Sequence, residues 1–387
     1  MINDSLKKKI VNTAYPRFKK VLTESKNILY LADNAGEIFF DKLLLEELVT
    51  RNKEITYAVK ANPILNDATF TDAKKAKNYI ESLNAEVAIK PIGLTVAKGV
   101  KVAGDHFNGT DEAIKYVEKV IKQKIGGKSK VLIEEKAEGE EFTLQAFSDG
   151  KTVMPLPAVQ DHKRLLPNDE GPNTGGMGAY SCANGLLPFL DKSDYEEGAN
   201  ILQKIIEALG KEGCPYVGPI YGQFMLTTNG PKIIEINARF GDPEAMNVLP
   251  LLETDFVEIC QAMTEKKLNK MKIKINHQST VCKYVVPEGY GKQSMAGEKI
   301  YVDENNIEKT GSKLFYASVN KMNDFVTTTT SRSLAVVGIS NQLSEAEKLC
   351  EESLKHVKGD HIFIRHDIGT EDLLNKKITH MNKIRGI

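Results

Sequence analysis

The stretch from Pro231 to Glu244, PKIIEINARFGDPE, constrains this chain more than any other. Its first part alternates apolar and polar side chains, which predicts a strand with two unlike faces. The apolar face would comprise Ile234, Ile236 and Ala238, and the polar face Glu235, Asn237 and Arg239. Carboxylate and amide oxygens suit Mg²⁺ and a guanidinium suits a phosphoryl oxygen, so the polar face predicts a metal–phosphate site. A half-exposed strand with a purely structural polar face would give the same pattern. The Asp242-Pro243 pair that follows predicts a helix N-cap and first helical residue.

The residues just before this strand predict its hairpin partner. Residues 218–230, GPIYGQFMLTTNG, read as a second strand and a turn. We predict a three-residue loop, 228–230, with Gly230 in its left-handed position. This loop length sets Gln223 opposite Glu235, so that Gln223 is a candidate third metal ligand.

The hairpin as a whole, IYGQFML…GPKIIEINARFGDPE, resembles the metal-binding signature of the phosphoribosylamine–glycine ligase family, whose members are ATP-grasp enzymes. The resemblance implies that Glu235 and Asn237 hold Mg²⁺ or Mn²⁺, with Gln223 beside them. It further implies that Arg239 contacts the transferring phosphate and makes Asp242 a catalytic candidate. The fold it implies is an ATP-grasp core with a lid.

Residues 87–102, VAIKPIGLTVAKGVKV, resemble the lid of that family. The resemblance implies a strand that carries Lys90 and a loop that carries Lys98, both directed at the phosphates of ATP. A lysine on a mobile loop suits this role because it can close over a triphosphate. The family usually has glycine before the loop lysine, and this chain has Ala97, so we expect a stiffer loop.

A strand predicted over Lys130 to Ile133 runs into a charged segment, EEKAEGEE. The family binds adenine at such a hinge, largely through backbone groups, and a nearby carboxylate takes the ribose hydroxyls. A charged exposed loop would have the same composition. The residues that the resemblance assigns to nucleotide binding here are Glu134, Glu135, Ala137 and Glu141.

Two further motifs match the family: QDHKR at 160–164 and GPNTGGMGAYS at 171–181. The second has little apolar content to bury, and its glycines would let backbone amides approach an anion. We call residues 171–181 the glycine-rich loop. The candidates for the acceptor and phosphate environment are Asp161, Lys163, Asn173, Thr174 and Gly175.

The N-terminal part reads differently. Residues 27–32 and 55–59 predict strands on either side of a helix, and therefore a parallel pair. Residues 28–72 resemble a fragment of the damage-control phosphatase family, which implies a metal site at Asp33, Asn34 and Asp67. A turn that caps the following helix explains the same residues. The ligase family's GxGGREH-type loop is not found in the chain.

Composition narrows the class of protein. The chain has 387 residues, with 52 Lys+Arg and 52 Asp+Glu, so its net charge favours neither nucleic acid nor an anionic membrane. Five scattered cysteines without a CxxC motif indicate reduced thiols. No apolar run approaches about 18 residues, so we expect a cytoplasmic enzyme with no membrane partner.

We therefore expect a multidomain protein of α/β and α+β class. The predicted parts are a partial βαβ unit (1–75), an ATP-grasp lid (84–137), an ATP-grasp core (138–274) and a β-rich C-terminal domain (275–387), with the ligase resemblance covering 84–387. The resemblance implies ATP-dependent ligation of glycine to phosphoribosylamine. The alternatives are an ATP-binding protein without ligase activity and a metal-dependent phosphatase.

Overall fold

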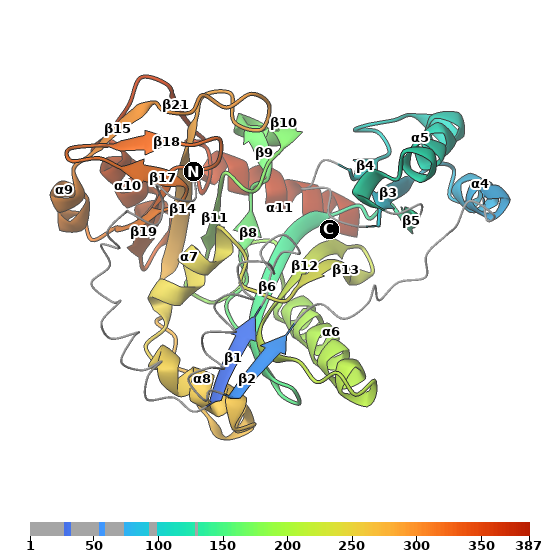
Figure 1. Cartoon of the computed structure of the whole chain (residues 1–387), viewed down its shortest axis with the longest axis horizontal. Helices are drawn as coiled ribbons and strands as arrows, with labels where there is room; N and C mark the ends of the chain where they lie inside the picture. Colours follow the sequence, from blue (N-terminus) through green and yellow to red (C-terminus); the bar gives the residue numbers. More distant parts are fainter. Residues whose placement is uncertain (1–26, 32–53, 59–72, 93–98, 128–130) are drawn as a thin grey trace. The chain divides into compact units, whose positions relative to one another are not determined.

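The computed structural model describes residues 27–31, 54–58, 73–92, 99–127 and 131–387 (Figure 1). The chain divides into two compact units, Met1–Pro63 and Ile64–Ile387. In the first unit, strands β1 (Asn27–Leu31) and β2 (Glu54–Ala58) pair in parallel, which confirms the predicted pairing. The predicted metal residues Asp33, Asn34 and Asp67 lie outside the described residues.

The second unit begins with a small sheet and two helices. Strand β3 lies between β4 and β5, antiparallel to both. Helix α5 is amphipathic and buries residues at helical spacing, which pack on this sheet. The elements are α4 (Ala73–Ser82), β3 (Val87–Pro91), β4 (Lys101–Val102), α5 (Gly109–Gln123) and β5 (Val131–Glu135). The strand predicted to carry Lys90 is confirmed as β3, and Lys98 lies outside the described residues.

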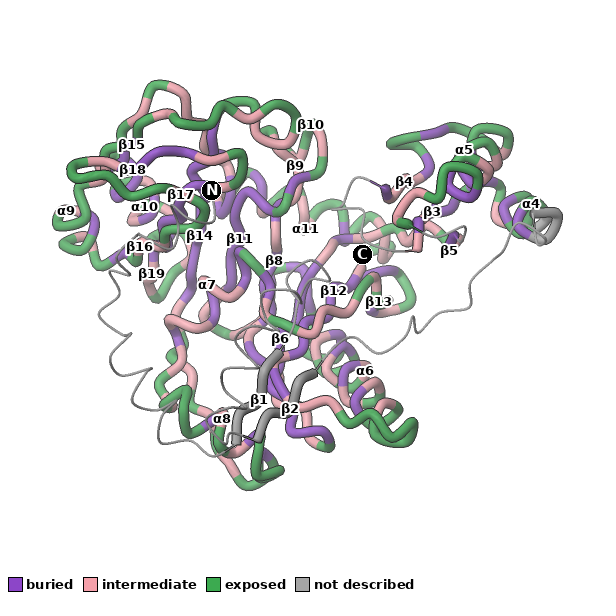
Figure 2. Tube along the Cα trace, in the orientation of Figure 1, coloured by how far each residue is buried: buried purple, intermediate pink, exposed green. Residues whose placement is uncertain are grey.

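A four-stranded antiparallel sheet follows, in the order β13-β12-β6-β7. Its bounds are β6 (Glu140–Asp149), β7 (Val153–Pro155), β12 (Val217–Thr227) and β13 (Gly230–Asn237). Strand β6 is buried along most of its length (Figure 2). Phe142 and Leu144 face helix α6 (Lys192–Lys211), whereas Phe147 contacts Phe256 of helix α8 (Phe256–Thr264). The sheet therefore lies between two apolar cores, because strand side chains alternate.

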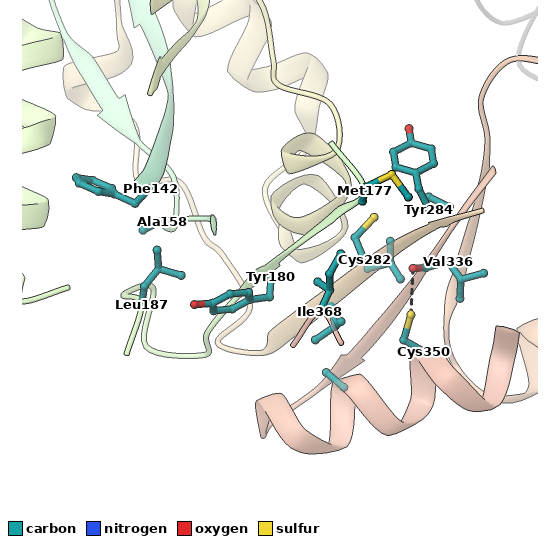
Figure 3. Packing of buried hydrophobic residues seen from close by; sticks show 14 of the residues in the cluster. Phe142, Ala158, Met177, Tyr180, Leu187, Cys282, Tyr284, Val336, Cys350 and Ile368 are labelled. Atoms are coloured by element: carbon teal, nitrogen blue, oxygen red, sulfur yellow. Dashed lines mark hydrogen bonds between the residues drawn. The ribbon is translucent and has the colours of Figure 1, made fainter. Parts of the chain in front are cut away.

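A six-stranded sheet links residues on both sides of position 275. Its order is β16-β19-β14-β11-β8, with β21 paired to β14. The bounds are β8 (Gln160–Asp161), β11 (Gly178–Ser181), β14 (Ser279–Pro287), β16 (Lys313–Tyr316), β19 (Leu334–Ser340) and β21 (Ile362–Ile364). Helix α10 (Leu343–Leu354) covers it, and the Cys350 thiol donates a hydrogen bond of 3.3 Å to the Val336 carbonyl oxygen (Figure 3).

The remaining elements include a second sheet in the C-terminal half and one hairpin before it. The sheet has the order β17-β18-β15-β20, and in the hairpin β9 pairs with β10, which contains the first residues of the glycine-rich loop. The bounds are β9 (Arg164–Leu166), β10 (Glu170–Asn173), β15 (Lys299–Val302), β17 (Val319–Lys321), β18 (Val326–Thr328), β20 (Val357–Lys358), α7 (Glu244–Val248), α9 (Glu304–Lys309) and α11 (Glu371–Arg385). None of the described helices is long and apolar enough to cross a membrane. All five cysteines are free thiols.

One local prediction at the start of helix α7 is wrong. Asp242 does not cap the helix, because α7 begins at Glu244 with Pro243 as its N-cap residue. A short 3₁₀ turn, Leu249–Leu251, separates α7 from α8. Asp255 starts α8 anew, since its carboxylate accepts hydrogen bonds from the amides of Val257 and Glu258.

Candidate functional site

One face of the four-stranded sheet carries the predicted chemistry. Paired residues of neighbouring antiparallel strands share a face. Tyr221 pairs with Gln145 and with Asn237, and Gln223 pairs with Glu235. We call this the site face and define it by Glu141, Gln145, Tyr221, Gln223, Glu235 and Asn237. The predicted division of the strand is thus confirmed for Glu235 and Asn237, while Ile236 packs toward the core on the other face.

The hairpin reaches this arrangement by a route that differs from the prediction. Thr227 pairs with Gly230, so the turn holds two residues, 228 and 229, and the predicted three-residue loop is wrong. Gly230 does adopt the predicted left-handed conformation, with φ +87°. The pairing then shifts by one residue at Ile234, between the pairs Phe224–Ile233 and Gln223–Glu235. This bulge restores the expected pairing of Gln223 with Glu235.

The predicted metal ligands differ in how many hydrogen bonds they already form within the protein. Asn237 donates its amide N–H to Glu235 Oε1 at 3.0 Å, which leaves the amide oxygen of Asn237 directed elsewhere. Gln223 is buried, and its amide is engaged at both ends, since its nitrogen donates to Glu141 at 2.6 Å and its oxygen accepts from Lys163. Among the described residues no three His, Cys, Asp or Glu side chains form a metal cluster. One carboxylate and one amide oxygen still fit Mg²⁺, which usually relies on substrate phosphates and water for its other ligands.

Lys163 brings a cation against the site face. Its ammonium donates to Gln223 and lies 3.6 Å from a carboxylate oxygen of Glu141. Burial alone would lower the pKa of Lys163, but the carboxylates of Glu141 and its neighbours outweigh burial and raise it. Lys163 therefore carries a fixed positive charge next to Glu235. Such a charge can neutralise a bound phosphate or carboxylate.

Two carboxyl groups near Lys163, those of half-buried Asp161 and fully buried Glu244, have shifted pKa values. Burial raises the pKa of Asp161, and the nearby carboxyl group of Glu244 raises it further. Burial also raises the pKa of Glu244, although the Tyr221 hydroxyl donates to it at 2.9 Å. Asp161 Oδ1 is buried without a hydrogen-bond partner. A raised pKa in a buried pair of carboxyl groups is typical of functional sites.

Three backbone amides of the glycine-rich loop donate hydrogen bonds to acceptors within the protein. The amide of Thr174 donates to the Lys163 carbonyl at 2.7 Å, that of Gly176 to the Thr174 hydroxyl at 3.1 Å, and that of Met177 to the His162 carbonyl at 2.8 Å. Asn173 lies in β10, paired with Arg164. These contacts hold Thr174 beside Lys163 and Asp161 opposite Ala179 of the loop's second strand. The expectation that loop amides bind an anion is therefore not met at these three positions.

Asp242 and Arg239 follow strand β13, which we call the metal strand because it carries Glu235 and Asn237. Both residues form hydrogen bonds outside the predicted metal site. The Asp242 carboxylate accepts hydrogen bonds from Arg332 at 3.0 Å and from the Tyr284 hydroxyl at 2.6 Å. Arg239 is exposed and donates to the Phe240 carbonyl at 2.8 Å, among other interactions. Asp242 is thus an anchored group, and its assignment as a catalytic residue has no geometric support here.

The predicted nucleotide residues on β3 and β5 are paired with each other and with the hairpin. The Lys90 ammonium lies 2.6 Å from a carboxylate oxygen of Glu134 and donates a hydrogen bond of 3.2 Å to the Ile234 carbonyl oxygen. Ile234 is the residue left without a pairing partner at the bulge. Glu135 forms an ion pair with Lys232. Ala137 is partly exposed in the segment between β5 and β6. The bulge therefore presents a carbonyl to the strand that carries Lys90.

Several residues that complete the site carry no signal in the sequence. Arg332 and Tyr284 come from distant positions, and no pattern around them indicates a role, whereas Tyr221 lies within the IYGQFML motif without being singled out there. Glu244 was within reach of sequence reasoning, because it ends the FGDPE run that follows the metal strand.

Comparison with known proteins shows which families and relatives the residues around this site resemble. A family model described as "Phosphoribosylglycinamide synthetase, ATP-grasp (A) domain" matches residues 54–245, and one described as "Phosphoribosylglycinamide synthetase, C domain" matches residues 280–371. The phosphoribosylamine–glycine ligase of Methanothermobacter thermautotrophicus is 49% identical over 355 residues, which cover 91% of this chain and 78% of that protein. The enzyme of the same name from Methanocaldococcus jannaschii is 47% identical over 315 residues, 81% of this chain and 70% of that protein.

Solved structures agree on the fold. Phosphoribosylamine–glycine ligase from Thermotoga maritima superposes with a TM-score of 0.67 at 23% identity, covering 88% of this chain and 99% of that one. The biotin carboxylase domain of Hydrogenobacter thermophilus 2-oxoglutarate carboxylase gives 0.65 at 14% identity, covering 96% and 84%. The predicted α/β and α+β multidomain ATP-grasp fold is confirmed. The match to the ATP-grasp family model begins at residue 54, earlier than the expected start of the ligase resemblance at residue 84. These comparisons give no support to the phosphatase resemblance of residues 28–72.

Proposed function

Because this chain belongs to the phosphoribosylamine–glycine ligase family, we propose that it joins glycine to 5-phosphoribosylamine with cleavage of ATP to ADP and phosphate, a step of de novo purine biosynthesis. The substrates are small molecules. In the first step, a carboxylate oxygen of glycine attacks the γ-phosphorus of ATP, the bond to ADP breaks, and glycyl phosphate forms. In the second, the amine nitrogen attacks the acyl carbon, the C–O bond to phosphate breaks, and the nitrogen loses a proton.

The observation that carries this proposal is the site face itself. Glu235 and Asn237 present two oxygen ligands beside the fixed charge of Lys163. These two residues would hold Mg²⁺ or Mn²⁺, which would neutralise charge on the phosphates of ATP. Gln223 would join them only after its amide is released by Lys163 and Glu141. Phosphorylation is needed because a carboxylate is a poor acyl electrophile.

The remaining assignments concern substrate binding. We assign Lys90 and Lys98 to the ATP phosphates, the hinge at Glu134, Glu135 and Ala137 to adenine, and Glu141 to the ribose hydroxyls. Lys90 would exchange its ion pair with Glu134 for a phosphate when ATP binds. We assign Arg239 to the transferring phosphate. We assign the binding of the acceptor substrate to Asp161, Lys163, Asn173, Thr174 and Gly175. The five free thiols support a reducing compartment, and we place the reaction in the cytoplasm.

One assay tests this function. The purified chain is incubated with Mg²⁺, ATP, glycine and phosphoribosylamine made in situ from ribose 5-phosphate and ammonia. ADP and the glycinamide product should form in equal amounts, and omission of glycine should stop both. ATP binding without glycine-dependent turnover would favour the ATP-binding alternative and overturn the ligase.

A further inference from the structure

Arg332 joins three separate segments of the second unit. It lies between β18 and β19, and its side chain is 14% exposed. One guanidinium nitrogen donates to the carbonyl oxygens of Gly175 at 2.7 Å and Gly176 at 3.2 Å, and to that of Asp242 at 3.0 Å. The other donates to the Asp242 carboxylate at 3.0 Å. The glycine-rich loop and the end of the metal strand are therefore tied together by a residue from the C-terminal half.

The position of Arg332 is itself fixed by Tyr284. The guanidinium carbon lies 4.5 Å from the centre of the Tyr284 ring, a cation–π contact. The Tyr284 hydroxyl donates to the second carboxylate oxygen of Asp242, and its amide donates to the Met177 carbonyl at 2.9 Å. Figure 3 shows Tyr284 next to Met177, which belongs to the glycine-rich loop. Both oxygens of Asp242 are thus held by residues from the C-terminal half.

The clamped loop lies directly over the buried carboxyl group of Asp161. A Cβ atom on Gly176 would lie 2.7 Å from Asp161 Oδ1 and 2.7 Å from Pro243. A Cβ atom on Gly175 would lie 3.4 Å from the guanidinium carbon of Arg332. At Gly176 the loop therefore approaches Asp161 more closely than a residue with a side chain could, and Arg332 contacts the loop at the neighbouring Gly175.

We propose that Arg332 is a positioning residue of the ligase reaction, which fixes the glycine-rich loop over Asp161 and so shapes the site for the amine substrate. The inference rests on the proposed function. A planar guanidinium can serve several acceptors in fixed directions, whereas a lysine ammonium is a point charge on a flexible stem. Lys90 and Glu134, assigned to ATP, have other partners. Loss of the clamp should therefore affect the amine and spare ATP, because small displacements in a site weaken substrate positioning strongly.

The test compares two arginine-to-lysine variants. Arg332→Lys keeps the charge and loses the planar fork. Arg385→Lys is the matched control, because Arg385 is 17% exposed and also binds carboxylates, of Asp191 at 3.1 Å and Asp194 at 2.7 Å, at the start of helix α6 away from the loop. We expect Arg332→Lys to raise the KM for phosphoribosylamine at least tenfold and to leave the KM for ATP within twofold. The control should change neither value by more than twofold.

The outcomes separate the two proposals. An unmodified chain without glycine-dependent ADP formation refutes the ligase function itself. An active chain in which Arg332→Lys leaves the amine KM unchanged, or raises both KM values equally, refutes the role of Arg332 alone. If Arg332→Lys does not fold, Tyr284→Phe replaces it, since it removes only the hydroxyl that binds Asp242. A twofold to fivefold rise in the amine KM then supports the inference, and an unchanged value overturns it.

Discussion

The hairpin β12–β13 and the glycine-rich loop meet at one site but are held there in different ways. In the hairpin, Gln223 and Glu235 are brought together by pairing of adjacent strands. In the loop, the carbonyl of Gly175 is bound by Arg332, which is 157 residues away in the chain. Local pairing leaves the Glu235 side chain exposed on the polar face, whereas the loop is packed and hydrogen-bonded on both sides. Substitutions in the hairpin should therefore impair the reaction alone. Substitutions in the loop should impair both the reaction and the stability of the fold.

The largest effect is expected for Glu235→Gln. This change removes the metal-binding charge at nearly constant shape, so ADP formation should be abolished. Because Glu235 is exposed and belongs to a local hairpin, the melting temperature should stay within about 2 °C. Glu196→Gln, at an exposed site on α6, is the control and should retain full activity. Undiminished turnover in Glu235→Gln would remove this residue from the metal site.

Gly176→Ala should show the opposite pattern in the loop. The added Cβ would meet Asp161 and Pro243 at 2.7 Å, in a backbone with φ +107°. We expect the free energy of unfolding to fall by about 2–4 kcal/mol, from overpacking and backbone strain together. Gly213→Ala separates the two causes, since Gly213 has φ +76° and no atom within 4 Å of the new Cβ. Its cost should be about 1 kcal/mol in urea unfolding, and equal costs for the two variants would contradict the packing argument.

A third effect concerns acid stability near the loop. Arg365 is fully buried and donates to Asp367 through two nitrogens, at 2.9 and 2.8 Å. Burial would raise the pKa of Asp367, but these hydrogen bonds outweigh it and lower the pKa. A lowered pKa in the folded state means that the carboxylate stabilises the fold above the unfolded pKa of about 3.9 and that this contribution is lost as the pH falls below it.

Asp367→Asn should therefore lower the free energy of unfolding at pH 7 by about 1–3 kcal/mol. It should also reduce the loss of stability as the pH falls below about 4 relative to the unmodified chain, because one titrating carboxylate is gone. Urea unfolding at several pH values measures both. If the two curves of stability against pH run parallel, the ion pair does not contribute to acid sensitivity.

The smallest effect is expected at the hairpin turn. Gly230→Ala places a Cβ in a left-handed conformation, 2.8 Å from the end of the flexible Glu197 side chain, which can move away. The cost should be about 1 kcal/mol of unfolding free energy with activity within twofold. A large loss of activity would show that the turn, and not only the bulge at Ile234, sets the pairing of Gln223 with Glu235.

Much of the site could be predicted because its signals are periodic or local. The alternation of residues 234–238 is enough to place Glu235 and Asn237 on one face, and the resemblance of residues 87–102 to the family's lid implies the strand that carries Lys90. Helix α11 was missed, because it is polar along most of its length and has only Leu373 and Met381 buried. The turn length was also wrong, since one bulge can compensate for one residue in a loop and leave the same pairing.

The sequence by itself determined the family, the ATP-grasp fold and the residue types on the metal strand, because strand periodicity and a run of chemically specific residues are properties of neighbouring positions. Only the tertiary structure decided that Gln223 is engaged by Lys163 and Glu141, that Asp242 is an anchor for Arg332 and Tyr284, and that Asp161 lies under Gly176. These contacts join segments that are far apart in the chain. Their geometry depends on how whole sheets pack against one another, and no local pattern of residues encodes that packing.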